Sequence, residues 1–332
     1  MKTHKLIIIA VAALVCVSTA NAGSELRIGS AGAQELLLPV GARGYALGGA
    51  LVSNVSGVEA TFWNPAGVSR EYGTEVMFTH IPYFAGIDIN FFGATTQIGD
   101  LGSFGFAAKI VDIGEIEETT EFDVDGTGSV YSPTLSVIGL TFSRQMTHQV
   151  NFGVTANFIS ERIFEVSANG LAFDFGFMFD PRWNGVQIGL VVKNIGGDMR
   201  FDGPGFNRSS SSLGNRNLRP ENALAELPTH VVIGASYTRP TEGLSSVTLS
   251  GNFQSNNFSE DAWIGGLEYS YDDKYFLRGG YNYSVQQDYV YGISVGGGIA
   301  IDLDETRLTV EASWRETEFF DNEVVFTGKL NF

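Results

Sequence analysis

The chain ends in Val324-Val325-Phe326-Thr327-Gly328-Lys329-Leu330-Asn331-Phe332, a stretch in which apolar and polar residues alternate. Side chains on a β-strand point to opposite faces in turn, so every second residue from Val324 onward shares one apolar face. The residues between them form a mostly polar face. Such a strand fits a wall with lipid on one side and a wet or packed interior on the other. It also fits an edge strand of a soluble sandwich, so the rest of the chain has to decide.

The first 22 residues have the features of a secretory signal peptide. Lys2 and Lys5 precede an apolar run, and Ala20-Asn21-Ala22 fits a signal-peptidase site. The run is shorter than the roughly 20 residues that a membrane-spanning helix needs. We therefore expect residues 1–22 to be removed on export, together with Cys16, the one cysteine of the chain. The remaining chain then has no thiol for a disulfide or a metal site.

The composition favours a β-rich, acidic protein and argues against several functions. The 332 residues include 41 glycines and 9 prolines, which suits many strands joined by turns. A net charge of -17 gives no electrostatic basis for binding nucleic acid. His80, His148 and His230 form no recognisable catalytic or metal-binding motif with their neighbours. We therefore predict no catalytic residue, no metal site, no cofactor and no enzymatic activity.

Fourteen segments combine alternation of apolar and polar residues with flanking turn residues. An even number of such strands suits a closed antiparallel barrel. The predicted strands are Thr74–Ile81, Ile87–Gln97, Gly102–Val111, Val130–Ser143, Gln149–Ser160, Leu171–Asp180, Val186–Asn194, His230–Thr238, Ser246–Gln254, Ala262–Tyr271, Tyr275–Tyr283, Val290–Ile301, Thr306–Thr317 and Val324–Phe332.

The lengths of the connections separate the barrel from the sandwich. Connections after even-numbered strands are all short, whereas Asp112–Ser129, Glu161–Gly170 and Ile195–Thr229 are long and follow odd-numbered strands. Outer-membrane barrels have short periplasmic turns and longer outer loops, and a soluble sandwich has no reason to sort its loops in this way. We therefore predict a fourteen-stranded antiparallel transmembrane β-barrel over residues 71–332, with the long loops outside.

The register of the predicted strands places several charged side chains inside the barrel. We expect them to pair and pack there, with selection of a solute as the alternative role. The predicted inward charges are Lys109, Asp174, Lys193, Glu268, Arg278, Glu311, Arg315 and Lys329. The same register places aromatic residues on the outer wall, where they are expected to form interfacial belts. These are Trp263, Tyr269, Tyr271, Tyr281 and Trp314.

Residues 23–70 do not alternate in the manner of strands. They are rich in small residues, and Glu35-Leu36-Leu37-Leu38 predicts one short helical turn before Pro39. A barrel of fourteen strands has a lumen too wide for its wall side chains to fill. We therefore predict that residues 23–70 form a plug, or hatch, inside the barrel.

Two stretches of this plug carry a resemblance to a known family. Val40-Gly41-Ala42-Arg43-Gly44-Tyr45-Ala46-Leu47-Gly48-Gly49-Ala50 is followed by Val58-Glu59-Ala60-Thr61-Phe62-Trp63-Asn64-Pro65-Ala66-Gly67. Together they resemble the signature of the PorV/PorQ family, a branch of the FadL-like outer-membrane barrels. The resemblance implies a fourteen-stranded barrel whose N-terminal hatch carries an Asn-Pro-Ala turn. The hatch motif consists of Gly41, Ala42, Arg43, Gly48, Gly49, Glu59, Trp63, Asn64, Pro65, Ala66 and Gly67.

The residue types of the hatch motif also have a physical meaning. Asn64-Pro65 starts a turn because proline fixes φ and asparagine bonds its own backbone. Gly48-Gly49 permits close packing or a positive φ. Arg43 inside a barrel needs a carboxylate or several carbonyls, and Glu59 is a candidate partner. Two interpretations stay open, a movable hatch or ligand-contacting turn and a fixed plug whose motif secures its own fold.

The resemblance implies a function as well as a fold. The PorV/PorQ branch implies a non-enzymatic component of type IX secretion that binds the C-terminal signal domains of secreted cargo or contacts the translocon. The FadL-like superfamily implies the alternative of a passive channel for hydrophobic small molecules, and a structural outer-membrane protein is a third interpretation. All three place the chain among the lipids of the bacterial outer membrane. Phe326, Leu330 and Phe332 are then expected to form the signal that the barrel-assembly machinery reads.

Overall fold

The computed structural model describes residues 27–332 apart from 211–215, 242 and 286–288. The predicted signal peptide therefore lies outside the described residues, as does the start of the predicted plug. Within the described part of the chain, no helix is both long and apolar enough to cross a bilayer.

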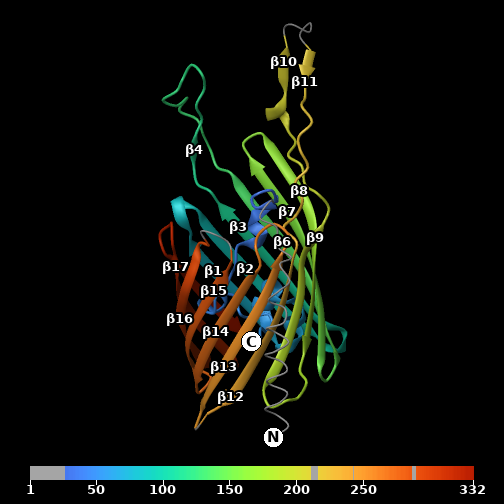
Figure 1. Ribbon diagram of the computed structural model, residues 1–332, viewed down its shortest axis with the longest axis vertical. Coiled ribbons are helices and arrows are strands. Elements are labelled where there is room, and N and C mark those ends of the chain that lie inside the picture. The colour runs from blue at the N-terminus through green and yellow to red at the C-terminus, as the bar shows by residue number, and fades with distance from the viewer. Residues whose placement is uncertain (1–26, 211–215, 242, 286–288) are drawn as a thin grey trace.

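Fourteen of the described strands close into a single antiparallel barrel (Figure 1). This confirms the predicted fold class. The strands are β1 (Thr74–Pro82), β2 (Asp88–Ile98), β3 (Gly102–Asp112), β6 (Thr134–Thr147), β7 (Val150–Ile163), β8 (Val166–Phe179), β9 (Val186–Gly196), β12 (His230–Pro240), β13 (Ser245–Asn256), β14 (Ala262–Tyr271), β15 (Tyr275–Ser284), β16 (Tyr291–Leu303), β17 (Thr306–Thr317) and β18 (Glu323–Asn331).

The C-terminal strand closes the barrel against the first one. β18 pairs with β1 in a register that places Phe326 opposite His80, and the backbone of Phe332 exchanges hydrogen bonds of 2.8 and 2.9 Å with Thr74. Phe326 on the outer face is 54% exposed, whereas its neighbour Val325 on the inner face is fully buried. The apolar face of the terminal stretch therefore points outward, as a wall in contact with lipid requires.

The two ends of the barrel differ in their connections. At one end, here the loop end, the chain forms two long excursions over residues 113–133 and 197–229. These contain the hairpins β4 (Ile116–Glu117) with β5 (Val130–Tyr131) and β10 (Arg208–Ser210) with β11 (Arg216–Leu218). Figure 1 shows both excursions reaching beyond the barrel rim. The opposite end, here the turn end, has short connections such as 272–274 and 304–305.

One predicted long loop is wrong. Instead of a loop over Glu161–Gly170, β7 and β8 continue their pairing to Ile163 and Val166 and are joined by a two-residue turn. Arg162 and Asn169 are exposed on this extension. Beyond the lipid layer an outward side chain need not be apolar, so the alternation that predicted the strands stops before the strands do.

The fourth strand begins later than predicted. β6 starts at Thr134, whereas Val130–Tyr131 pairs with β4 outside the barrel. Pro133 lies between the two segments and has no backbone N–H to donate to a ladder, so it separates the barrel strand from the loop hairpin.

The described part of the predicted plug fills the barrel with short helical turns. Val40, Leu51 and Val55 are fully buried, and Leu47 is 1% exposed. Helices this short are not stable by themselves, so packing against the wall holds them in place. They are η3 (Gln34–Leu37), α2 (Ala42–Ala46), η4 (Gly57–Glu59), α3 (Ala60–Trp63) and η5 (Pro65–Arg70).

Glycines on the inner face of the wall make room for the plug. A Cβ added to Gly153 on β7 would lie 2.3 Å from the carbonyl carbon of Pro65, and one on Gly280 of β15 would lie 2.3 Å from that of Leu47. Gly189 on β9 approaches the carbonyl oxygen of Val52 in the same way. The abundance of glycine therefore reflects close contact between wall and plug as well as turns.

Candidate functional site

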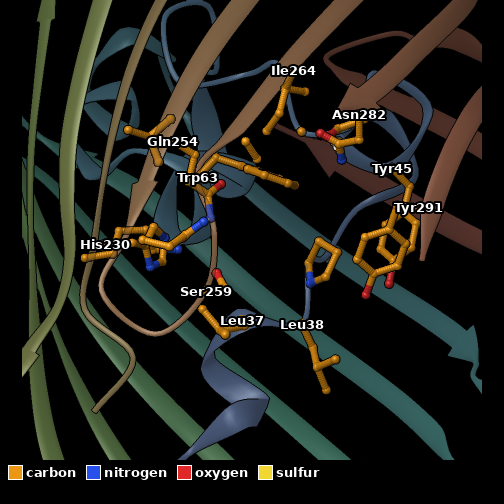
Figure 2. A pocket seen from close by; sticks show the side chains of 18 of the residues that line it. Leu37, Leu38, Tyr45, Trp63, His230, Gln254, Ser259, Ile264, Asn282 and Tyr291 are labelled. Carbon is orange, nitrogen blue, oxygen red and sulfur yellow. Dashed lines mark hydrogen bonds between the residues drawn. The ribbon is translucent and has the colours of Figure 1, made fainter. Parts of the chain in front are cut away.

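A cavity lies between the plug and one side of the barrel, toward the loop end. This loop-end cavity has a volume of about 510 Å³. The plug contributes Leu37, Leu38, Tyr45 and Trp63, and the wall contributes side chains from β9 and from β12 to β17. Figure 2 shows Tyr45 and Tyr291 on one side of this space and Trp63, His230 and Gln254 on the other.

Two cationic groups at the margin of the loop-end cavity, Arg315 and Lys193, already have partners. The Arg315 guanidinium lies 4.2 Å from the ring centroid of Tyr45 and 3.9 Å from that of Tyr291, and its Nε donates to Glu323 at 2.9 Å. Lys193 Nζ donates to the carbonyl of Phe62 at 2.7 Å. Because these charges are satisfied within the protein, aromatic and aliphatic surface dominates what a guest molecule would meet.

The Asn-Pro-Ala turn of the hatch motif ties the plug to itself and to the wall. Asn64 Nδ2 donates to the carbonyls of Val52 at 2.7 Å and of Phe177 at 3.2 Å, and its Oδ1 accepts from Ala66 N at 3.2 Å. Pro65 begins η5, and Gly67 lies so close to Val55 that a Cβ would be 2.5 Å from its carbonyl oxygen. The turn is thus built into the packing of the plug and does not line the loop-end cavity.

Trp63 lies against the α2 helix of the plug. Its Nε1 donates to the carbonyl of Val40 at 3.1 Å, and its indole covers Gly44, where a Cβ would lie 2.4 Å from the ring. Gly41 has φ 84°, and the following residue, Ala42, donates its N–H to Thr327 Oγ1 on β18 at 2.9 Å. The motif therefore fixes α2 between Trp63 and the wall.

Gly48 and Gly49 attach the chain that follows α2 to β15 and β13 of the wall. Both have positive φ, at 63° and 98°. Asn282 on β15 donates to the carbonyl of Gly48, and Asn252 on β13 donates to that of Gly49, each at 2.8 Å. These inward asparagines were not among the predicted site residues, although a polar amide on the inner face of a strand was a signal that a backbone partner was needed.

Four of the predicted lumen charges and the motif residue Arg43 lie near the turn end. Arg43 Nε and Nη2 lie 3.0 and 3.2 Å from the two carboxylate oxygens of Glu268, whereas the expected partner, Glu59, is 3.8 Å from Arg43 Nη1. Arg278 joins Glu268 to Glu311 with contacts of 2.6 and 2.8 Å. Lys329 lies 3.2 Å from Glu311 and 3.5 Å from Glu59. Arg315 lies instead at the margin of the loop-end cavity.

The remaining lumen charges contact the plug or the backbone. Lys109 Nζ donates to the carbonyl of Leu38 at 2.8 Å. Asp174 accepts from Asn157 Nδ2 at 3.0 Å and from the backbone N–H of Asn194 at 2.7 Å. Lys109 therefore contacts the plug, whereas Asp174 is held within the wall.

A second cavity lies below the α2 helix, toward the turn end. This turn-end cavity has a volume of about 380 Å³ and is lined by Arg43 and the charges around it. The next two residues of α2, Gly44 and Tyr45, line the loop-end cavity instead. The barrier between the two cavities is therefore one helical turn thick. Among the described residues, no group of three or more His, Cys, Asp and Glu side chains is arranged to hold a metal ion.

Comparisons with known proteins give structural neighbours. No protein-family model and no curated protein matches the sequence. The Pseudomonas putida toluene transporter TodX matches with a TM-score of 0.56 and 14% identity, over 88% of this chain and 97% of that one. The CymD monoaromatic hydrocarbon channel matches with a TM-score of 0.55 and 12% identity, over 89% and 98%. A Pseudomonas aeruginosa FadL homologue gives 0.52 and 13%, also over 89% and 98%. The fold is therefore FadL-like.

Proposed function

We propose that this barrel is a passive, non-enzymatic channel through which small hydrophobic molecules, of the size of monoaromatic hydrocarbons, cross the outer membrane. The observation that carries the proposal is the loop-end cavity of about 510 Å³, lined largely by aromatic and aliphatic side chains and separated from the turn-end cavity by the single turn of α2. Pockets of this size and character suit small apolar ligands. Two of the structural neighbours, a toluene transporter and a monoaromatic hydrocarbon channel, support the same class of solute.

A solute can pass from the loop-end cavity to the turn-end cavity only if α2 or the side chain of Trp63 moves aside. The turn between the cavities is held by side-chain contacts to Glu268, Thr327 and Asn282 and not by continuous secondary structure with the wall. A small shift of α2 would join the two cavities, which is the movable-hatch interpretation of the motif.

A flux measurement tests the channel. Proteoliposomes are loaded with a solvatochromic dye, and the entry of toluene is timed. The variant Gln254→Trp fills the mouth of the loop-end cavity, and Leu249→Trp adds the same ring to the same strand on the outer face, where Leu249 is 54% exposed. We expect flux above that of protein-free liposomes, loss of it in Gln254→Trp and retention in Leu249→Trp. Equal flux with and without wild-type protein contradicts the channel.

The loop end favours a second candidate function, docking of a protein. The acidic excursion over residues 113–133 carries Phe122 and Val124 at its tip, 91% and 77% exposed. Exposed apolar side chains on a projecting loop suit a protein partner. For the PorV/PorQ-type role, that partner is the type IX translocon or the C-terminal domain of its cargo.

Co-purification tests this second candidate. The full chain is extracted gently from outer membranes, and proteins that accompany it are identified by mass spectrometry. A translocon subunit or cargo with a shared C-terminal domain, lost in the double variant Phe122→Ser with Val124→Ser, supports the secretion role. Recovery of the barrel with lipids and the assembly machinery alone contradicts it.

A further inference from the structure

A third, smaller pocket lies at the turn end between η5 and the ends of β6 to β9. It has a volume of about 180 Å³ and is distinct from both cavities described above. Most of its lining consists of polar side chains that are able to donate or accept hydrogen bonds, among them Ser53, Arg70, Gln145, His148, Asn151 and Gln187. The lining combines three plug residues, Ser53, Ser69 and Arg70, with four wall strands, so a bound molecule would touch both.

Arg70 brings a positive charge to this pocket without a carboxylate partner. Its Nη1 contacts neutral groups, namely Gln187 Oε1 at 3.2 Å, the carbonyl of Ser53 at 3.5 Å and Met178 Sδ at 4.0 Å. Within the described residues it makes no salt bridge, unlike Arg43 and Arg315. Burial lowers the pKa of Arg70, and the nearby carboxylate of Asp180 offsets part of that effect. A partly buried guanidinium with neutral neighbours is stabilised by an anion.

Ser53 provides a hydroxyl that has no partner. Its side chain is fully buried, and its Oγ forms no hydrogen bond within the described residues. Leaving a buried hydroxyl without a partner costs free energy, so the position suits a hydroxyl that donates to a bound ligand. Ser53 lines the same pocket as Arg70, and Arg70 contacts its carbonyl.

One acidic side chain also lines the pocket, and it is engaged elsewhere. Asp180 Oδ1 accepts the backbone N–H of Arg182 at 2.7 Å within an exposed turn. His148 also lines the pocket, and its ring can form hydrogen bonds. The guanidinium of Arg70, which has no salt-bridge partner among the described residues, therefore favours a negatively charged guest.

We propose that Arg70 and Ser53 form a binding site for a small oxyanion, the carboxylate or phosphate group of a solute or a free ion, at the turn end of the barrel. Arg70 would bind two oxygens through its guanidinium, and Ser53 would donate to one of them. Asn151 on β7 and Gln187 on β9 lie beside the same pocket, so the anion would bridge plug and wall. The site does not depend on passage of hydrocarbons through the loop-end cavity.

Nuclear magnetic resonance of weak ligands tests the site. Full-length protein in detergent micelles is mixed at constant ionic strength with acetate, observed by saturation transfer to its methyl protons, or with inorganic phosphate, observed by its ³¹P line width. We expect a saturable signal that falls by about fivefold or more in Arg70→Gln, since a charged hydrogen-bond pair is lost. The signal should persist in Arg144→Gln, a change at an exposed arginine of β6 at the same end of the barrel.

A second variant separates binding from folding. Ser53→Ala removes a hydroxyl that bonds to nothing in the described protein, so it should leave thermal stability intact while weakening the signal. Response to acetate alone assigns a carboxylate, response to phosphate alone assigns a phosphate, and response to both assigns an oxyanion in general. No saturable signal in the wild type, or an equal signal in Arg70→Gln, overturns the proposal.

Discussion

Arg43 and Glu268 form a two-pronged ion pair, with Nε and Nη2 of the guanidinium 3.0 and 3.2 Å from the two carboxylate oxygens. The pair joins α2 of the plug to β14 of the wall. In Arg43→Gln, Glu268 keeps Arg278 as its one close cation, and loss of one member of a buried pair costs about 3 kcal/mol. We expect amide hydrogens over residues 42–49 to exchange faster in this variant, while those of the barrel strands stay protected.

An exposed ion pair supplies the control for this prediction. Lys274 lies 3.5 Å from Asp272 in a turn-end connection, with both side chains well exposed. Lys274→Gln should leave exchange in the plug unchanged, because exposed pairs contribute less than about 1 kcal/mol. Unchanged exchange in Arg43→Gln would show that the plug is held by its apolar contacts alone.

Gly153 should not tolerate a side chain. A Cβ at this position would lie 2.3 Å from the backbone of Pro65, and backbone does not move aside as a flexible side chain does. We expect Gly153→Val to destabilise the seated plug by about 2 kcal/mol or more, the scale of an overpacked core. Limited proteolysis within residues 50–70 measures the displacement.

Gly265 on β14 offers the matched control for Gly153. A Cβ at Gly265 would meet no heavy atom within 4 Å, and the residue is exposed on the outer face. Gly265→Val should therefore leave the plug resistant to protease. If protease cleaves both variants equally, valine destabilises the strand in which it lies, and the contact with Pro65 is not the cause.

The buried carboxyl of Glu35 predicts that docking of the plug depends on pH. Burial, with the nearby carboxylate of Glu161 and against the charge of Lys109, raises the pKa of Glu35 from 4.5 to about 8. The folded state then holds a proton that the unfolded state has released, so stability should fall as pH rises from about 5 to about 8. Glu35→Gln cannot lose this proton and should match wild type at low pH and exceed it at high pH.

Thermal unfolding at both ends of this range measures the effect of Glu35. The melting temperature of wild type should decrease between pH 5 and pH 9 by more than that of Glu35→Gln. A control at an exposed carboxylate, Glu121→Gln, should change neither the melting temperature nor its dependence on pH. A constant difference between Glu35→Gln and wild type across the range would refute titration of this carboxyl.

The terminal aromatic residue is expected to act in assembly and not in the finished barrel. Phe332 is 56% exposed, and its backbone rather than its ring pairs with Thr74. Phe332→Ala should therefore reduce the amount of barrel in outer membranes while leaving the melting temperature of purified protein within about 1 °C. A lowered melting temperature with normal yield would assign the ring to stability instead.

The fold could be read from the sequence because the lipid imposes alternation on every strand. Val324 to Phe332 shows this pattern, and the same period of two located all fourteen strands. This pattern failed where lipid no longer dictates the outward residue, which is the part of β7 after Ser160 and the part of β8 before Leu171. It also failed at Val130, where two residues alternate correctly but pair outside the barrel.

The site could be predicted only in part, because its contacts depend on how far each strand is from the plug. The motif residues and inward charges were identified by type, yet the choice of Glu268 over Glu59 as the closer partner of Arg43 follows from the position of β14 around the barrel. The cavity residues Tyr291, Ile264 and His230 had no sequence signal of their own. Inward glycines such as Gly153 were the overlooked signal for where plug meets wall.

The glycine-faced inner wall has a consequence for how such barrels diverge. On each strand the lipid accepts any apolar residue at outward positions, so these positions drift freely from one descendant to the next. The inward glycines, where a single methyl group would strike the plug backbone, have far fewer acceptable replacements. Sequence similarity between related barrels should therefore be retained mainly at the inward positions, which are alternate residues of each strand. Identity averaged over whole strands underestimates this similarity. A sequence comparison restricted to inward positions should reveal relationships between barrels whose full sequences no longer show detectable similarity.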